Sequence, residues 1–269
     1  SKTGETFTID IDQSELSDSY EFKQYMVVPD EGYPASWPGE AVIIPMEDGS
    51  APGVFKEDVT LPDDFGQGTL DVDGLTLEGS DPIDRPVIEG QLGGQHHGGT
   101  PYPVWHDVTI ENLVLRNDGT IFEGTKGGGD PIEFDNVVFD NVKFDLTGDA
   151  YFVFTPDSEG NTSYLSDEGL TFKNSEFVVG NNYPGPGVIG AWGGFAGDGA
   201  FTITSSSFSS SYSGFTGFLR VEAWGPETTV NITDNQFQAS QRGYLLLAGE
   251  GIGSSQGPED ADVSGNYFE

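Results

Sequence analysis

The chain has 269 residues, of which 45 are acidic and 10 are basic, so its formal net charge is −35. A surface of this charge repels polyanions, which excludes nucleic acid and anionic membranes as partners. The chain contains no cysteine, which excludes disulfides and thiolate chemistry. Hydrophobic residues make up 35% of the chain, which argues against disorder and suffices for one large core.

The acidic residues are spread along the chain and are not gathered in a tail. At low ionic strength their mutual repulsion would strain any compact fold. In molar salt the screening length falls to about 3 Å, and most of this repulsion vanishes. The composition therefore favours a halophilic source, a haloarchaeon or one of its viruses, and predicts an extracellular or virion-surface location in high salt.

The first 53 residues lack the repeat that organises the remainder of the chain. Within them, residues 5–11 and 40–45 carry the apolar patterns of strands. A solenoid needs its first coil covered. We therefore predict an N-terminal β-cap over residues 1–53 and a solenoid over residues 54–269.

From residue 54 onward the chain repeats an eight-residue pattern: apolar, any, apolar, any, bend-forming, any, any, large apolar. The seven copies begin at residues 70, 108, 137, 170, 201, 230 and 261. Alternating apolar side chains predict a strand with one buried face. Asn, Asp and Gly tolerate left-handed backbone and favour a bend. The fifth position holds Gly74, Asn112, Asn141, Asn174, Ser205, Asp234 and Gly265.

The eighth position of each copy points inward again after the bend. A second strand follows most bends, at residues 150–154, 187–192, 217–224 and 243–247, with no helical stretch between them. Each coil can then bury its apolar face against the next, which predicts an all-β parallel β-helix of about seven coils, roughly 30 Å long. We expect the eighth-position side chains to stack as one column: Leu77, Leu115, Phe144, Phe177, Phe208, Phe237 and Phe268.

Two other β architectures fit this pattern less well. A β-propeller needs about 40–45 residues and four strands per blade, and an antiparallel sandwich does not require so regular a period. Residues 75–90, with the Asn-x-x-Phe strands that follow, resemble coils of the pectate-lyase-like right-handed parallel β-helix superfamily. The resemblance spans residues 54–269 and implies a right-handed coil. This superfamily includes polysaccharide lyases, glycoside hydrolases, epimerases, viral tailspikes and non-catalytic adhesins, so the fold does not select among these functions.

Trp192 and Trp224 end two aligned strands. Alternation along these strands predicts that both rings point outward on successive coils, about 5 Å apart. An amphipathic ring pair of this kind is a platform for sugar rings. The competing interpretations are that a loop covers the two rings or that they lie in a subunit interface.

Catalytic candidates are few. In a polysaccharide lyase, Arg220 or Arg242 would take the proton next to a uronate, and Glu222 shares the strand of Arg220; the alternative is that each arginine forms a surface ion pair. Glycoside hydrolysis needs two acids roughly 5–10 Å apart. The candidates on loops of adjacent coils are Asp130, Asp149 and Asp157, and with 45 acidic residues such pairs also arise by chance.

No metal site or cofactor is predicted with defined ligands. His96, His97 and His106 lie in or after a Gly-rich loop, and imidazoles can bind transition metals. Adjacent histidines on one strand face opposite sides, however, so a solvated loop is the preferred interpretation. Ca²⁺ or monovalent cations are compatible with the acidic clusters.

The sequence thus favours a structural or adhesive β-helix: a virion spike, turret, fibre or decoration protein, or a cell-surface protein. We expect a homo-oligomer or an assembly partner at the C-terminal coil, and contact with host or surface glycans. The alternative is a secreted halophilic polysaccharide lyase or glycoside hydrolase.

Overall fold

A computed structural model provides the three-dimensional structure. Every named element in the described part is a β-strand, and every strand pairing is parallel, which confirms the predicted all-β fold. The structure describes residues 41–44, 54–55, 59–60, 72–79, 81–94, 103–125, 131–148, 152–156, 162–180, 187–191, 193–211, 217–221, 223–239, 245–246, 258 and 260–269.

The strands form three parallel sheets. The first contains β1 (Ala41–Ile44), β5 (Thr76–Gly79), β8 (Val104–Glu111), β11 (Glu133–Asp140), β14 (Ser163–Lys173), β18 (Ala200–Thr204), β21 (Thr229–Thr233) and β24 (Asp260–Ser264), with β4 (Val72–Asp73) beside β8 and β17 (Phe195–Ala196) beside β14. The second contains β2 (Val54–Phe55), β6 (Val87–Glu89), β9 (Val114–Asn117), β12 (Lys143–Leu146), β15 (Glu176–Val179), β19 (Ser207–Ser210), β22 (Gln236–Ala239) and β25 (Tyr267–Phe268). The third contains β3 (Val59–Thr60), β7 (Leu92–Gly94), β10 (Phe122–Thr125), β13 (Phe154–Thr155), β16 (Ile189–Ala191), β20 (Leu219–Val221) and β23 (Leu245–Leu246).

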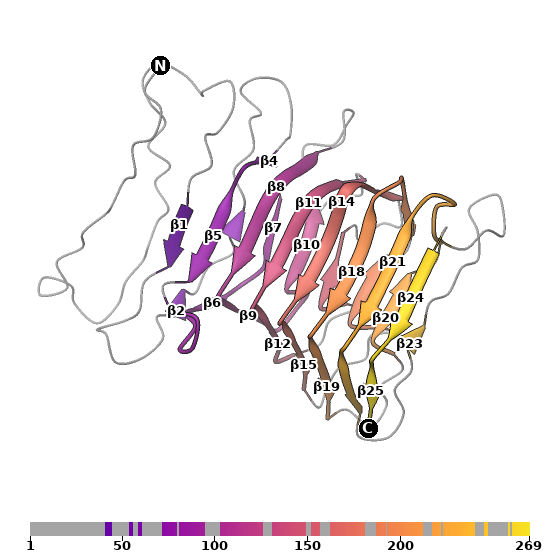
Figure 1. Cartoon of the computed structure of the whole chain (residues 1–269). Coiled ribbons are helices and arrows are strands. Elements are labelled where there is room, and N and C mark those ends of the chain that lie inside the picture. Colours follow the sequence, from indigo (N-terminus) through magenta and orange to yellow (C-terminus); the bar gives the residue numbers. More distant parts are fainter. Residues whose placement is uncertain are drawn as a thin grey trace, which may run out of the picture.

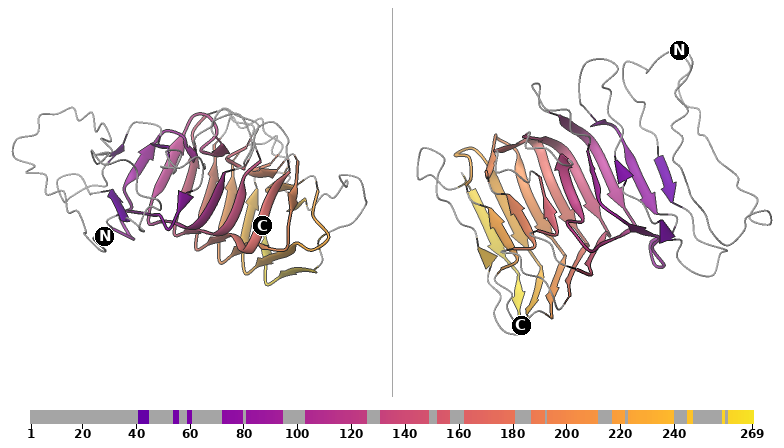
Figure 2. Two further views of the ribbon diagram at one scale, coloured as in Figure 1. Left: turned by 90° about the horizontal axis from the view of Figure 1, so that it is seen from above. Right: turned by 180° about the vertical axis from the view of Figure 1, so that it is seen from behind.

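The chain winds through these sheets in turn and forms a parallel β-solenoid of about five turns. It descends the first sheet, crosses along the second and rises through the third as it advances toward the C-terminus, which makes the coil right-handed (Figure 1). The two further views show the same stack of strands from above and from behind (Figure 2). About seven coils were predicted, so the predicted number was too high.

The register of the first sheet follows the sequence repeat. Val137 is paired with Val108 on one side and with Leu170 on the other, and Phe139 lies between Ile110 and Phe172. Equivalent positions of successive copies therefore lie directly above one another. We call each set of strands contributed by one copy a rung.

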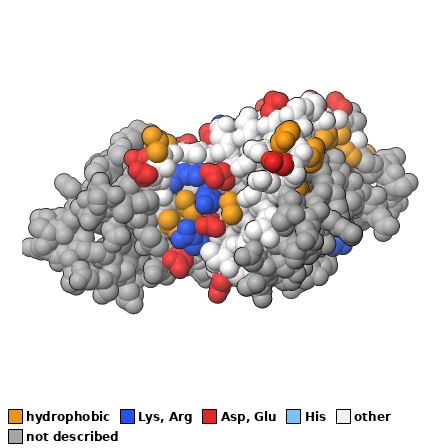
Figure 3. Space-filling model, turned by 90° about the horizontal axis from the view of Figure 1, so that it is seen from below, with side chains coloured by type: hydrophobic (Ala, Val, Ile, Leu, Met, Phe, Trp, Pro, Cys, Tyr) orange, Lys and Arg blue, Asp and Glu red, His pale blue; other side chains and the backbone are white. Residues whose placement is uncertain are grey.

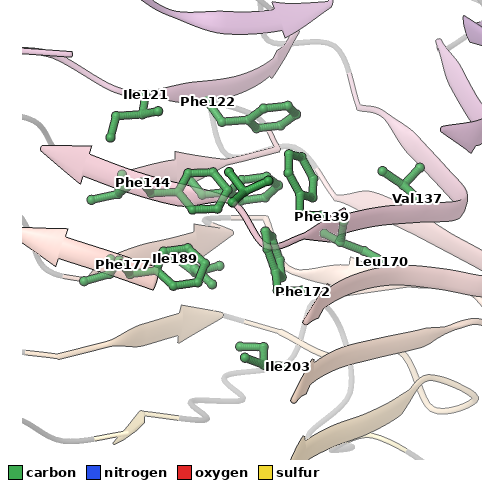
Figure 4. Close-up of a cluster of buried hydrophobic side chains, with 14 of the residues drawn as sticks. Ile121, Phe122, Val137, Phe139, Phe144, Leu170, Phe172, Phe177, Ile189 and Ile203 are labelled. Atoms are coloured by element: carbon green, nitrogen blue, oxygen red, sulfur yellow. The ribbon is translucent and has the colours of Figure 1, made fainter. Parts of the chain in front are cut away.

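The predicted phenylalanine column is present in the core. Phe177 stacks on Phe144 with ring centroids 4.6 Å apart and on Phe208 at 4.4 Å, with interplanar angles of 4° in both pairs. The column continues through Phe237 to Phe268, with centroid distances of 4.9 Å at each step. Figure 4 shows that side chains from the other sheets point toward this column. Burial of the rings from Phe144 to Phe237 contributes about 1.5–3 kcal/mol each, so this part of the column is a main source of stability, whereas Phe268 is 53% exposed.

The structure adds a bend that the repeat did not predict. In the first sheet, Asp107, Asn136 and Asp167 have φ values of 52°, 56° and 48°. These left-handed residues divide β8, β11 and β14 into two arms. The signal was an Asp or Asn shortly before the first apolar residue of the copy, directly before it at Asp107 and Asn136 and three residues before it at Asp167.

The predicted cap lies largely outside the described residues. Its described strand, β1, adds to the first sheet by pairing with β5, so residues 41–44 are a strand as predicted and continue the parallel stack. The boundary at residue 53 stays a prediction. Among the described residues, no helix has the length and hydropathy needed to cross a membrane.

Candidate binding groove between the first and second sheets

The bend between the first and second sheets is built from the fifth position of the repeat. All seven residues at this position are left-handed, with φ between 51° and 66°. Apart from glycine, which has no Cβ, Asn and Asp adopt this conformation most readily, which explains six of the seven residues at this position, Ser205 being the exception. The predicted bends are confirmed at Gly74, Asn112, Asn141, Asn174, Ser205, Asp234 and Gly265.

A ladder of buried polar side chains lies directly inside this bend, at the sixth position of the repeat. Ser175 Oγ accepts a hydrogen bond from the backbone N–H of Val142 at 3.2 Å, and Ser206 Oγ accepts one from Ser175 N–H at 3.0 Å. Asn235 Oδ1 accepts the N–H of Ser206 at 2.9 Å. Each polar side chain thus satisfies a backbone donor of the preceding rung, which would otherwise be buried without a partner.

The same ladder also satisfies carbonyl groups. Asn235 Nδ2 donates to the carbonyl oxygen of Ile203 at 2.9 Å, and Ser206 Oγ donates to that of Thr204 at 2.9 Å. Ser175, Ser206 and Asn235 are 1–3% exposed. The backbone of the bend is therefore held rigidly from within. This ladder was not predicted from the sequence. Its signal is a change at the sixth position of the repeat, from Leu113 and Val142 to Ser175, Ser206 and Asn235.

A shallow groove of about 500 Å³ runs along the outside of the bend over the rungs of β14–β15, β18–β19, β21–β22 and β24–β25. In Figure 1 these rungs lie toward the C-terminal end, and the first and second sheets meet at their lower edge. Hydroxyl, amide and carboxylate groups form most of the lining, and Tyr267, which is 59% exposed, is its one aromatic residue. We call it the bend groove. Its lining residues are Asn174, Ser175, Glu176, Ser205, Ser206, Ser207, Asp234, Asn235, Gln236, Gly265 and Tyr267. Among them, the ladder residues Ser175, Ser206 and Asn235 are buried and form its floor, so the exposed polar groups come from the other residues.

Arg85 contacts Glu176, which lines the bend groove. The guanidinium group of Arg85 donates to the backbone oxygen of Asn141 at 3.1 Å and to its Oδ1 at 3.2 Å. It also forms an ion pair with Glu176. The Asn141 side chain in turn donates to Asn112 Oδ1 at 2.9 Å. Because the Arg85 side chain is only 12% exposed, it acts here as an anchor for Glu176 and has little surface left for a ligand.

The Trp224 prediction is wrong in orientation. Trp224 is 5% exposed, and its ring packs against Phe195 at 5.8 Å and Phe201 at 5.6 Å. The strand β20 ends at Val221, and both Ala223 and Trp224 are buried. The alternation that would have placed the ring outside therefore stops before it. An outward tryptophan pair cannot form with Trp224 in the core.

Most of the other predicted site residues fall outside the described part of the chain. Arg220 lies on β20, half-buried, between Gly190 and Leu246 in the third sheet. The predicted residues that lie outside the described part are Trp192, Glu222, Arg242, Asp130, Asp149, Asp157, His96 and His97.

His106 lies in an acidic cluster at the second bend of the first sheet. Its Nδ1 is 2.8 Å from Asp73 Oδ1, and its Nε2 is 3.6 Å from carboxylate oxygens of Asp107 and Asp135. The hydrogen bond to Asp73 is the main cause that raises the pKa of His106, and the charges of the three carboxylates act in the same direction. Within the described ranges, no set of His, Asp and Glu side chains has the arrangement of a metal site.

The chain was compared with known proteins. No model of a known protein family, no curated protein and no solved structure matches it. The fold assignment therefore rests on the strand pairings themselves. The bend groove, with its regular array of hydrogen-bonding groups, is the candidate site of the described structure.

Proposed function

We propose that this protein is a structural or adhesive β-solenoid of a halophilic cell or virion surface, and that it binds glycans in the bend groove. The observation that carries the proposal is the groove lining, in which hydroxyl and amide groups recur on successive rungs. Rungs of a parallel sheet are about 4.8 Å apart, so these groups form a regular ladder of donors and acceptors. A polyhydroxylated chain lying along the groove can bond to several of them at once.

The chemistry of the lining suggests a class of glycan. Tyr267 offers an exposed amphipathic ring at the C-terminal end of the groove, and such rings pack on the apolar faces of sugars. Glu176 and Asp234 accept hydrogen bonds from sugar hydroxyls but repel uronates and sulfates. The proposal is therefore for a neutral or amino-substituted glycan, in contrast to the acidic polymers that pectate-lyase-like enzymes would cleave.

The rigidity of the groove supports a binding role. The Ser175–Ser206–Asn235 ladder fixes the backbone beneath the groove, so little conformational entropy is lost when a ligand binds. The resemblance to the pectate-lyase-like superfamily, which includes adhesins, agrees with a carbohydrate ligand. The enzyme alternative, a lyase or hydrolase, is kept as an outcome of the test.

The test is binding of the full chain to a panel of polysaccharides in molar salt. Tyr267→Ala and Gln236→Ala should each lower the affinity for a retained glycan by about tenfold, which corresponds to loss of about 1.4 kcal/mol. Asn231→Ala is the matched control, because Asn231 lies on the neighbouring strand β21 but outside the groove lining. Equal binding by all variants, or no binding to any glycan, would reject the proposal. Release of reducing ends or of 4,5-unsaturated uronides would replace it with the enzyme alternative.

Assembly with other subunits is part of the same proposal. Val263 and Phe268 on β24 and β25 are 44% and 53% exposed, which supports the contact expected at the C-terminal coil. Phe268→Asp should weaken such assembly, as measured by sedimentation in molar salt. An unchanged distribution of masses would contradict a contact at this position.

A further inference from the structure

The outer face of the second sheet differs in composition from the rest of this acidic chain. Three adjacent strands, β9, β12 and β15, each present two outward side chains that are partly exposed. In the space-filling view from below, basic side chains gather on this side of the molecule with hydrophobic ones between them (Figure 3). We call the six residues the β12 face: Val114, Arg116, Lys143, Asp145, Glu176 and Val178.

The β12 face is balanced in charge. Its basic side chains are Arg116 and Lys143, with Arg85 at its edge. Its acidic side chains are Asp145 and Glu176, with Glu89 on the preceding strand β6, so the two signs are equal in number. Arg116 is 3.0 Å from Asp145 Oδ2, and Lys143 is 4.0 Å from the same atom. A chain with a net charge of −35 thus places three of its ten basic residues on one small surface.

The outer face of the first sheet has the opposite character. Glu78, Glu111 and Asp140 are paired in a row, and Lys173 follows Asp140. Burial raises the pKa of Glu111, and the charges of Glu78 and Asp140 raise it further. A second copy of this chain would be repelled there, whereas no such repulsion opposes it at the β12 face.

We propose that the β12 face binds a second copy of this chain, so that two solenoids lie side by side and point the same way. The symmetry is a two-fold axis parallel to the solenoid axis. About such an axis, equivalent strands of the two copies lie at the same height and run in opposite directions. Each outward residue therefore faces the residue two positions away on the equivalent strand of the other copy. Contacts of this kind are isologous, so the assembly closes as a dimer.

The order of residues along each strand is complementary under this symmetry. On β12, Lys143 of one copy faces Asp145 of the other, and the pair occurs twice. On β9 and β15, a valine faces the alkyl portion of Arg116 or Glu176. On β19 and β22 the pairs are Ser207 with Ser209 and Gln236 with Gln238. No rung from β9 to β22 brings two like charges together, which would be destabilising.

The size of the face predicts a weak dimer. The five strands from β9 to β22, with a spacing of about 4.8 Å and a width of about 13 Å, give roughly 300 Å² per copy. A stable interface usually buries about 800 Å² per partner. The dimer should therefore depend on protein concentration, and molar salt should favour it by screening the repulsion between the two acidic chains.

The first experiment is sedimentation equilibrium of the full chain and two matched variants in molar salt. Val178→Glu places a carboxylate opposite Glu176 of the second copy and should weaken dimerisation at least tenfold. Val138→Glu introduces the same charge at a partly exposed valine on the outer face of the first sheet and should leave it unchanged. Equal dimerisation of both variants, or a wild-type monomer at all concentrations, would overturn the proposal.

The second experiment does not depend on altered charges. Because the chain has no cysteine, Ser209→Cys creates a single thiol on the second sheet, and Thr202→Cys creates one on the first sheet as a control. A short bismaleimide should link Cys variants at position 209 into dimers and leave those at position 202 monomeric. The reverse pattern would place the contact elsewhere.

The proposed interface shares Glu176, Ser207 and Gln236 with the lining of the bend groove, so the variants that test it are placed outside that lining and away from the last rung. Val178 and Ser209 do not line the bend groove, so their variants should retain glycan. Conversely, Phe268→Asp should not change cross-linking at position 209. Loss of glycan binding without loss of the dimer, or the opposite result, shows which proposal has failed.

Discussion

Asn266 Oδ1 accepts a hydrogen bond from the backbone N–H of Asn235 at 3.0 Å, one full rung earlier in the chain. Asn235 makes the same contact with Ser206, and Ser206 with Ser175. In the last four copies, a side chain at the sixth position therefore connects its rung to the one before. These hydrogen bonds join five rungs along the inner edge of the bend, whereas the first three copies have leucine or valine at this position.

The first prediction concerns this ladder. Asn235→Leu should lower the free energy of unfolding by about 2–4 kcal/mol, because it leaves the Ser206 N–H and the Ile203 carbonyl buried without partners. Asn231→Ala, on the outward side of β21, is the control and should change stability by about 0.5 kcal/mol or less. Denaturant titration of both variants in molar salt measures the difference. Equal stability of the two would mean that the ladder is not needed for the bend.

The second prediction concerns the phenylalanine column. Phe177 is fully buried between Phe144 and Phe208, so Phe177→Ala should cost about 3–5 kcal/mol through lost burial and the cavity that remains. Phe268 is 53% exposed, so Phe268→Ala should cost about 1 kcal/mol or less, since little of its area leaves water on folding. Thermal unfolding of the two variants tests the column. A similar loss for both would contradict its role in the core.

The third prediction concerns the bend itself. Ser205 is left-handed, with φ of 51°, at a position where the three preceding rungs have Asn. Ser205→Asn should raise stability slightly, by about 0.5 kcal/mol, while Ser205→Val should lower it by about 1–2 kcal/mol, because a β-branched residue is disfavoured in this conformation. Ser207→Val, on the adjacent strand, should be neutral. If Ser205→Val were as stable as the wild type, the left-handed bend would be in doubt.

Part of the fold was predictable from the sequence, and part was not. The bends at Asn112, Asn141 and Asn174 and the Phe144–Phe268 column followed from period and composition, since only a few residue types suit each position. The orientation of Trp224 did not follow from the sequence pattern, because it depends on where β20 ends. The end of a strand is set by contacts between rungs. The bend groove was also not predictable, since its residues are polar ones of common types that become a site only when four rungs are stacked.

The fourth prediction follows from net charge. If the halophilic interpretation is correct, the free energy of unfolding should fall steadily as salt is lowered from molar concentration to about 0.1 M, where the screening length grows to about 10 Å. Sucrose at equal osmolarity is the control, because it favours compact states without screening charge. Circular dichroism during urea titration measures this dependence. Full stability in low salt would contradict the halophilic interpretation.

The last prediction concerns the pH dependence of stability at the second bend. Asp73 bonds to His106 across 33 positions, and this bond, with the charges of Asp107 and Asp135, raises the pKa of His106 above its ordinary value. Protonated His106 is therefore favoured in the folded state. Its contribution is complete below the unfolded pKa of about 6.5 and is lost as the pH rises through the higher folded value. The melting temperature at constant salt should fall over this interval, and His106→Gln should reduce the slope. Because His106 is about half exposed, the effect should be small and should weaken further in molar salt. An NMR titration that gives His106 a pKa at or below its ordinary value would contradict this assignment, whatever the other two histidines do.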